Sequence, residues 1–178
     1  MNGGMRIGCV LAGCLAASLG LAATKYSLKD LGVLNGHGVS WAYGISPSGS
    51  VVGNSAATRQ AEHAYVYTDG AMVDLGTLGG DRSEAFGINN AGCVVGRAET
   101  AKAGPHAFLY DGRRMLDVNK LLDASGAKWN VTYATAINDS GQIAAVAYYG
   151  RNKAVCHAVL LTPNDLKHDR GRVAAFKN

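Results

Sequence analysis

Short runs of alternating apolar and polar residues occur along residues 26–163, and turns rich in Gly, Asn, Asp and Ser separate them. In residues 64–67, small and branched side chains alternate with tyrosines, which predicts a strand with two different faces. The apolar spacing of three and four that indicates a helix is weak and confined to residues 116–122. The pattern therefore predicts an all-β fold.

One pattern of about 43 residues occurs three times in this region. Its first part is HAYVYTDGAMVDLG, HAFLYDGRRMLDVN and HAVLLTP, which start at His63, His106 and His157. Its second part is SWAYGISPSGSVVG, SEAFGINNAGCVVG and TYATAINDSGQIAA, which start at Ser40, Ser83 and Thr132. The third copy is longer than the first two, as terminal repeats often are.

Each copy contains the turn chemistry of two hairpins. Gly49, Gly92 and Gly141 end four-residue turns in which glycine would take the left-handed conformation after a type I turn. Asp-Gly pairs at 69–70 and 111–112 mark the second hairpin. Four short strands in about 43 residues are typical of a propeller blade or a trefoil unit.

The two ends of the repeat region complement each other. Residues 26–32, YSLKDLG, match the second strand of a hairpin, and the final HAVLLTP matches the first. If these two strands paired, three units would form a propeller-like or trefoil-like ring without an open edge. A partial propeller completed by oligomerisation is the alternative.

The segment DLGTLGG at 74–80, followed by SEAFGINNAGCVVG and HAFLY, resembles the HAF repeats of bacterial extracellular proteins. That family takes its name from the tripeptide found here at residues 106–108, and the resemblance covers residues 26–163. It implies an extracellular β-repeat protein. It implies no established catalytic activity, cofactor or substrate.

Residues 1–23 have the features of a secretory signal peptide: one basic residue, Arg6, a short apolar run and small residues at its end. Cleavage is expected near Ala22 or Ala23. Residues 11–14, LAGC, also fit a lipobox, in which case Cys14 would be lipidated and would anchor the protein in the outer membrane. The predicted organisation is a signal peptide (1–23), a HAF-type β-repeat domain (24–163) and a short basic C-terminal tail (164–178), in a protein exported to the periplasm or the extracellular space.

Composition excludes some partners. The chain has 178 residues, 24 of them Gly, and a net charge of +4, of which much lies in the tail. The repeat region is therefore nearly neutral and has no basic stripe for nucleic acid, and a membrane partner is expected only if Cys14 is lipidated. Cys93 and Cys156 could form a disulfide after export, or could remain two separate buried thiols.

Two residue types recur at fixed repeat positions: His63, His106 and His157, and Asp30, Asp74 and Asp117. Converging histidines could bind zinc or copper, but metal-site spacings are absent, and hydrogen bonding to a neighbouring turn is the favoured role. Identical carboxylate positions do not suit an acid and a base with different environments, so turn capping is favoured for the aspartates. No cofactor is expected.

Catalytic residues differ from one another in kind, so they should interrupt the repeat, and no such set is found. The connectors before each repeated histidine do vary, and we predict binding by Arg59, Tyr148, Tyr149, Arg151 and Lys153. Trp41 is expected in the core, and Trp129 could be exposed for sugar stacking. The sequence thus favours a non-catalytic module that binds a protein or a glycan. The alternatives are an envelope hydrolase with an acidic site in the third repeat and a purely structural array.

Overall fold

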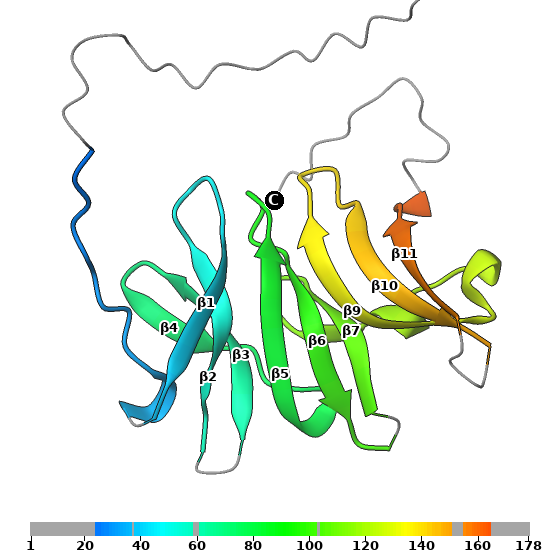
Figure 1. The fold of residues 1–178 in the computed structure, drawn as a ribbon, viewed down its shortest axis with the longest axis horizontal. Helices are drawn as coiled ribbons and strands as arrows, with labels where there is room; N and C mark the ends of the chain where they lie inside the picture. The colour runs from blue at the N-terminus through cyan, green and yellow to red at the C-terminus, as the bar shows by residue number, and fades with distance from the viewer. Residues whose placement is uncertain (1–23, 37, 59–60, 103, 151–154, 165–178) are drawn as a thin grey trace, which may run out of the picture. The chain divides into compact units, whose positions relative to one another are not determined.

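The computed structural model describes residues 24–36, 38–58, 61–102, 104–150 and 155–164. The chain divides into two compact units, Met1–Asp30 and Leu31–Asn178. In the first unit the described residues, 24–30, contain neither helix nor strand. All described secondary structure belongs to the second unit (Figure 1). The predicted signal peptide with Cys14, and the tail beyond Asn164, lie outside the described residues.

The second unit is all-β, as predicted, and its described strands form three consecutive antiparallel groups, here called meanders. The first meander is β1 (Ser40–Ile45), β2 (Val51–Ala56), β3 (Glu62–Thr68) and β4 (Ala71–Asp74). The second is β5 (Gly79–Ile88), β6 (Val94–Thr100), β7 (Gly104–Tyr110) and β8 (Met115–Asp117). The third is β9 (Trp129–Ile137), β10 (Ile143–Tyr149) and β11 (Val155–Leu161).

Three short 3₁₀ helices complete the described secondary structure: η1 (Leu34–Gly36), η2 (Val118–Lys120) and η3 (Ala124–Gly126). The weak helical spacing at 116–122 therefore produces a single 3₁₀ turn. Within the described ranges, no helix is long and apolar enough to span a membrane.

Hydrogen bonding joins the strands into two sheets, and both are open. A single parallel pair, Glu62 with Arg82, links β3 to β5 and so joins the first two meanders into one sheet. The third meander is a separate sheet in the order β11-β10-β9. The expected ring closure is not formed, because residues 26–32 are not in a strand and β11 pairs only with β10 in the described part of the chain.

The hairpin turns form where the sequence places them. Gly49, Gly92 and Gly141 have φ of 90°, 80° and 74°, and each donates its N–H to the carbonyl three residues earlier. This is a type I turn followed by a left-handed glycine. The turns therefore fix the register between the first and second strands of every meander.

Apolar side chains fill the two junctions between meanders. The first junction buries Val52, Ala64 and Leu75 of the first meander against Ala85, Ile88, Val94, Ala98 and Phe108 of the second. The second junction buries Val95, Ala107 and Val118 of the second meander against Val131, Ala134, Ile143, Ala145 and Ala147 of the third. The earlier meander contributes residues 43 positions apart to the two junctions: Val52 and Val95, Ala64 and Ala107, and Leu75 and Val118.

Polar contacts hold each junction together. At the first, the Ser83 hydroxyl donates to the Gly76 carbonyl and accepts the Ala64 N–H at 2.8 Å. At the second, the turn before β6 contacts the turn before β10: Asn90 donates its backbone N–H at 2.8 Å and its side-chain N–H at 2.6 Å to Asp139. These bonds hold the pKa of Asp139 below its usual value, because both favour the ionised carboxylate.

The contact between turns generates a pH-dependent prediction. The pKa of Asp139 is lower in the folded protein than in the unfolded chain, where it is near 3.8. The ionised carboxylate therefore stabilises the fold above pH 3.8, and this stabilisation is lost as the pH falls through the folded-state pKa. Asp139→Asn should therefore lower the midpoint of thermal unfolding at pH 7, and the difference from the parent should shrink below pH 3.8. Calorimetry across this range measures it, and a difference that did not depend on pH would contradict the assignment.

Two glycines allow the first and second strands of a meander to approach closely. A Cβ at Gly53 would lie 1.7 Å from the Trp41 carbonyl oxygen, and one at Gly96 would lie 1.9 Å from that of Glu84. Both glycines face a bulge in the partner strand. The third meander has Ala145 at this position and keeps the equivalent bulge, and its register shifts a second time between Val146 and Ala147.

We predict that Gly96→Ala lowers the free energy of unfolding by about 3 kcal/mol, at the upper end of overpacking costs, because backbone must move to admit the methyl group. Ala71→Gly, on an exposed position of β4, is the control and should cost about 0.5–1 kcal/mol. Urea unfolding of the two variants and the parent measures both values. Equal costs would show that the close approach at Gly96 is unimportant.

Candidate recognition surface

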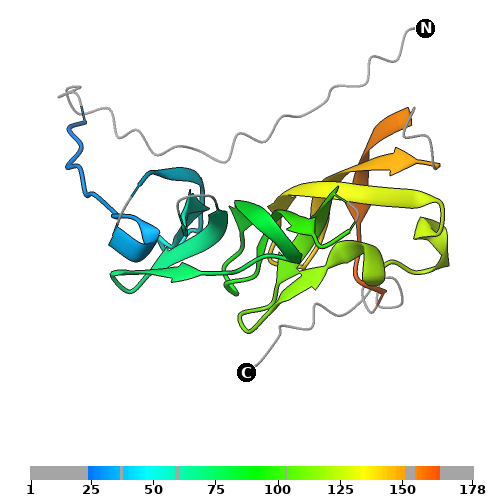
Figure 2. The same ribbon diagram turned by 90° about the horizontal axis from the view of Figure 1, so that it is seen from below.

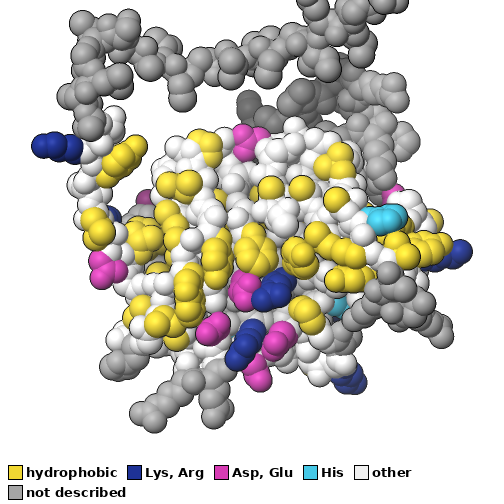
Figure 3. Space-filling view, viewed as in Figure 1, with side chains coloured by type: hydrophobic (Ala, Val, Ile, Leu, Met, Phe, Trp, Pro, Cys, Tyr) yellow, Lys and Arg dark blue, Asp and Glu magenta, His cyan; other side chains and the backbone are white. Residues whose placement is uncertain are grey.

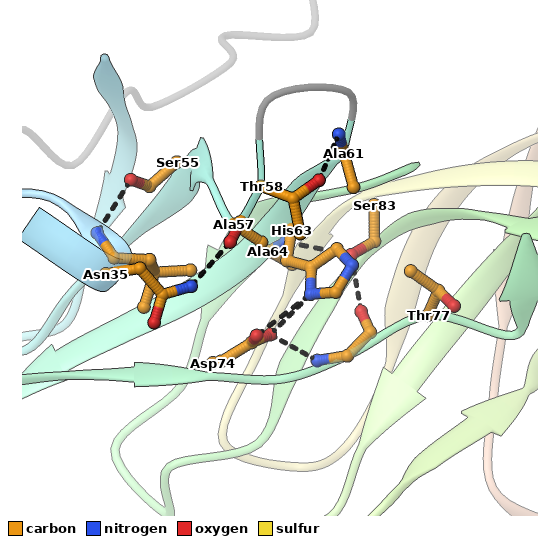
Figure 4. Close-up of polar contacts among 12 residues, drawn as sticks. Asn35, Ser55, Ala57, Thr58, Ala61, His63, Ala64, Asp74, Thr77 and Ser83 are labelled. Atoms are coloured by element: carbon orange, nitrogen blue, oxygen red, sulfur yellow. Dashed lines mark hydrogen bonds and ion pairs between the residues drawn. The ribbon is translucent and has the colours of Figure 1, made fainter. Parts of the chain in front are cut away.

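The repeated histidines and aspartates lie together in the first two meanders. The His63 Nδ1 atom lies 3.0 and 2.9 Å from the two carboxylate oxygens of Asp74 (Figure 4). In the second meander, His106 Nδ1 lies 3.0 Å from Asp117 Oδ2. In each case the histidine is near the start of the third strand and the aspartate ends the fourth, so the pair connects these strands.

Further hydrogen bonds give both aspartates a turn-capping role. Asp74 accepts the Gly76 N–H at 2.7 Å, and Asp117 accepts the Asn119 N–H at the start of η2. Ser83, which Figure 4 shows beside His63, is 1% exposed and uses its hydroxyl on backbone groups. In this geometry Ser83 donates its hydroxyl proton to the Gly76 carbonyl oxygen and not to the His63 imidazole. His63, Asp74 and Ser83 therefore all have structural partners.

The third histidine has a different environment. His157 on β11 packs its ring against Trp129, with 5.6 Å between ring centroids. Asp30 lies in residues 24–30, which form no strand. No group of three or more His, Cys, Asp or Glu residues suited to hold a metal ion occurs within the residues that the structure describes.

The structure describes only part of the predicted connector site. Arg59, Arg151 and Lys153 lie outside the described residues. Of the strands that precede the connectors, β2 and β6 end at the bottom of Figure 1, and β10 ends at its right. At the end of β10, Tyr148 is half-buried and Tyr149 is 41% exposed.

The aromatic residues at this end of the third meander contact one another. Tyr149 packs edge-on against Trp129, with 5.0 Å between centroids, so Trp129 is half-buried and not fully exposed. The pKa of Tyr148 is raised chiefly by the charge of Cys156, which lies opposite it on β11. Cys93 and Cys156 are both free thiols, so the disulfide considered from the sequence is not formed.

A row of aromatic rings crosses the first strands of the three meanders. The ring centroids of Tyr43 on β1 and Phe86 on β5 are 5.6 Å apart, and those of Phe86 and Tyr133 on β9 are 6.5 Å apart. Tilted and edge-on contacts at these distances are favourable for aromatic pairs. Trp41, which we expected in the core, is 42% exposed on β1, because its face of the strand is not covered by another meander.

The register places three different residue pairs at one equivalent position of the meanders. These cross-strand pairs are Trp41–Asn54, Glu84–Arg97 and Tyr133–Val146. The neighbouring positions hardly vary: Ala42, Ala85 and Ala134 follow the first member of each pair. Side chains that change while the scaffold repeats are candidates for recognition. We call Trp41, Tyr43, Phe86, Tyr133 and the Glu84–Arg97 pair the aromatic strip.

The charged pair of the strip is a two-point contact. Arg97 Nε lies 3.1 Å from Glu84 Oε2, and Arg97 Nη2 lies 2.9 Å from Glu84 Oε1. The Arg97 side chain remains 45% exposed. Its pKa is raised, chiefly by the hydrogen bond to Glu84. The pKa of Tyr43 is raised by burial and then by the negative charges of Glu84 and Glu62. The strip therefore offers rings and a fixed ion pair on one surface.

Asn54 is an incompletely satisfied buried residue beside the strip. It is 2% exposed, its amide donates to Glu62 Oε2 at 3.2 Å, and its Oδ1 atom has no hydrogen-bond partner.

A pocket of about 130 Å³ lies next to the Glu84–Arg97 ion pair. It is lined by Arg82, Ser83, Glu84, Arg97, Ala98, Glu99 and Pro105. Figure 3 shows this face, with a band of hydrophobic side chains beside mixed acidic and basic ones.

A larger groove of about 350 Å³ lies in the expanded part of the third repeat, between η2, η3 and strands β10 and β11. Its lining is mostly aliphatic, and Asp123 is the one acidic residue among its described lining. Asp123 accepts hydrogen bonds from the backbone and hydroxyl of Ser125 at the start of η3. The groove therefore does not show the two carboxylates that a hydrolytic site in the third repeat would need.

The aromatic strip is not visible in any one repeat, because its rings come from the first strands of three meanders. Tyr43 and Phe86 are 43 residues apart, and this spacing could have shown that they are neighbours. Tyr133 is two residues out of step with them in the repeat alignment, so only the folded register brings it to the row.

Comparison with known proteins finds no matching family model, no similar curated protein and no similar solved structure.

The two His–Asp pairs differ in exposure, which allows a matched test. The Asp117 side chain is 9% exposed and that of Asp74 is 40% exposed. Asp117→Ala should lower the free energy of unfolding by about 1–3 kcal/mol, because it leaves buried donors without a partner. Asp74→Ala should cost about 1 kcal/mol or less, because water replaces the lost contacts. Denaturant unfolding compares the two, and a larger cost at Asp74 would contradict the structural role proposed for the buried pair.

Proposed function

We propose that the protein is an exported, non-catalytic β-repeat module of the HAF type that binds a glycan through the aromatic strip. In this proposal the three meanders are tandem copies of one propeller-like unit, and the third is completed by a strand with the sequence of residues 26–32. The resemblance of residues 26–163 to HAF repeats and the equivalent residues at both junctions support the repeat. The signal-like residues 1–23 support a periplasmic or extracellular location.

The observation that carries the proposal is the variation at one position of a repeated scaffold. Trp41–Asn54, Glu84–Arg97 and Tyr133–Val146 occupy equivalent cross-strand positions and share no residue type. The alanines at 85 and 134, which are buried at the junctions beside them, do not vary. A surface that changes from unit to unit is suited to a ligand that presents different groups along its length.

The chemistry of the strip favours a glycan. Exposed rings of Trp41 and Tyr43 can pack on the apolar faces of sugar rings, and their exposure of 42% and 49% leaves those faces accessible. The Glu84 carboxylate and the Arg97 guanidinium can accept and donate hydrogen bonds to hydroxyl groups. Paired opposite charges give no net attraction for a phosphate backbone, which disfavours nucleic acid.

The proposal predicts that Trp41→Ala and Tyr43→Ala each weaken glycan binding at least tenfold, equivalent to about 1.4 kcal/mol, because each removes an exposed ring from the strip. A glycan array of bacterial and plant polysaccharides would identify a ligand, and calorimetry with that ligand would measure the affinity of each variant. Both side chains are more than 40% exposed, so the variants should fold as the parent does.

Tyr149→Ala is the control, since Tyr149 is similarly exposed but lies away from the strip at the end of β10. It should leave the affinity unchanged. If combined replacement of Tyr148, Tyr149 and Arg151 abolished binding while the strip variants kept it, the connector loops would be the binding site. A parent protein that bound no polysaccharide would contradict the proposal.

A further inference from the structure

The series of meanders has an uncovered apolar face at each end. At the near end, Ala42 and Ile45 of β1 are exposed, Ile45 to 68%. At the far end, Ala144 of β10 and Ala158 of β11 are exposed. These four residues are small or aliphatic. The end strands β1 and β11 contain no buried residue, whereas β10 buries Ile143, Ala145 and Ala147.

The equivalent residues at the internal junctions are fully buried. Ala85 and Ala134 correspond to Ala42, Val52 and Val95 correspond to Ala144, and Ala64 and Ala107 correspond to Ala158. All six have an exposure of 0%, and all six belong to the two junction clusters. The two end faces therefore carry the two halves of one further junction of the same kind.

Within the described residues, the far end has no fourth strand. In the first meander β4 pairs with β3, with Met72 opposite Tyr67 and Asp74 opposite Tyr65. The sequence KDLG at 29–32 corresponds to VDLG at 73–76. Carried over to β11, this register places Leu28 opposite Leu161 and Asp30 opposite Val159. Leu28 is 93% exposed and lies in a segment that forms no strand.

The near end already contains part of the polar contact that a junction needs. At the first internal junction, Ser83 donates to the Gly76 carbonyl and accepts the Ala64 N–H. At the near end, Ser40 donates in the same way to the Gly32 carbonyl, at 2.8 Å. The backbone N–H equivalent to that of Ala64 belongs to Ala158, at the far end of the series.

We propose that two copies of this chain associate head to tail, and that residues 27–31 of each copy form the fourth strand beside β11 of the other. Ala42 and Ile45 of one copy then cover Ala144 and Ala158 of its partner copy. Two identical junctions of this kind close six meanders into a ring with two-fold symmetry. This inference rests on the repeat organisation given under the proposed function.

The arrangement of the meanders favours a second copy over closure within one chain. Buried clusters fix the first meander on the second and the second on the third, and the two uncovered faces lie at opposite ends of the resulting open series (Figures 1 and 2). Propellers typically close with four to eight blades. Six units fall within that range, and three do not.

Cysteine cross-linking tests the proposed register. In a full chain whose four native cysteines are replaced by alanine, Leu28→Cys and Leu161→Cys are introduced into separate chains, which are then mixed and oxidised. Directly opposed antiparallel residues have Cα atoms about 4.5–5.5 Å apart, which permits a disulfide. We expect a cross-linked band of two chain masses on a non-reducing gel, and light scattering of the unmodified parent should give the mass of two chains.

The matched control uses Val159→Cys in place of Leu161→Cys. Residue 159 lies on the same face of β11 but two residues out of register with Leu28. Because diagonal residues are about 7–8 Å apart, this pair should cross-link at least tenfold less. Ala158→Arg, which places a charge in the new junction, should shift the parent mass from two chains to one. A monomeric parent whose Leu28→Cys/Leu161→Cys double variant cross-links within one chain would overturn the second copy but keep the proposed repeat. Absence of any cross-link in register would overturn the fourth strand itself, and with it the proposed completion of the third unit.

Discussion

The fold depends on how each meander buries its apolar face against the next. A short antiparallel meander cannot cover both of its faces alone, so its second and third strands need the first strand of a neighbour. Alanine at 64 and 107 lets the backbones approach closely, and the Ser83 hydroxyl satisfies the Ala64 N–H that this approach buries. Removing one meander would therefore expose the face of another, and each junction stabilises two units together.

The parts of the fold that follow from local chemistry could be predicted from the sequence. Glycine is needed at 49, 92 and 141 because the backbone there has positive φ, and this requirement is visible in the letters alone. The alternation in residues 64–67 correctly gave a strand with two distinct faces. Its two faces pack into different clusters, Ala64 at the first junction and Tyr65 against Leu34 and Ala57. Local signals therefore determined the strands and the turns.

The features that depend on neighbouring meanders could not be predicted in the same way. Trp41 has the hydrophobicity of a core residue, but it lies on the face of β1 that carries the aromatic strip and not on the Ala42 face, so the ring stays exposed. Glu84 and Arg97 are 13 residues apart, and only the β5–β6 register makes them a two-point ion pair. The aromatic strip likewise requires three first strands side by side. Each of these features is a property of the sheet arrangement and not of one segment.

The same arrangement connects the aromatic strip to the two uncovered end faces of the series of meanders. Trp41, Glu84 and Tyr133 hold one position in successive meanders, so the strip runs along the series and stops where the series stops. In a head-to-tail pair, the residue that follows Tyr133 at this position is Trp41 of the other copy. A long glycan would then contact six such positions in place of three. The protein's affinity for the glycan would be higher in the two-chain assembly, because contacts with the second copy follow the first as an intramolecular step. The proposed assembly and the proposed recognition would in this way both follow from one repeated junction.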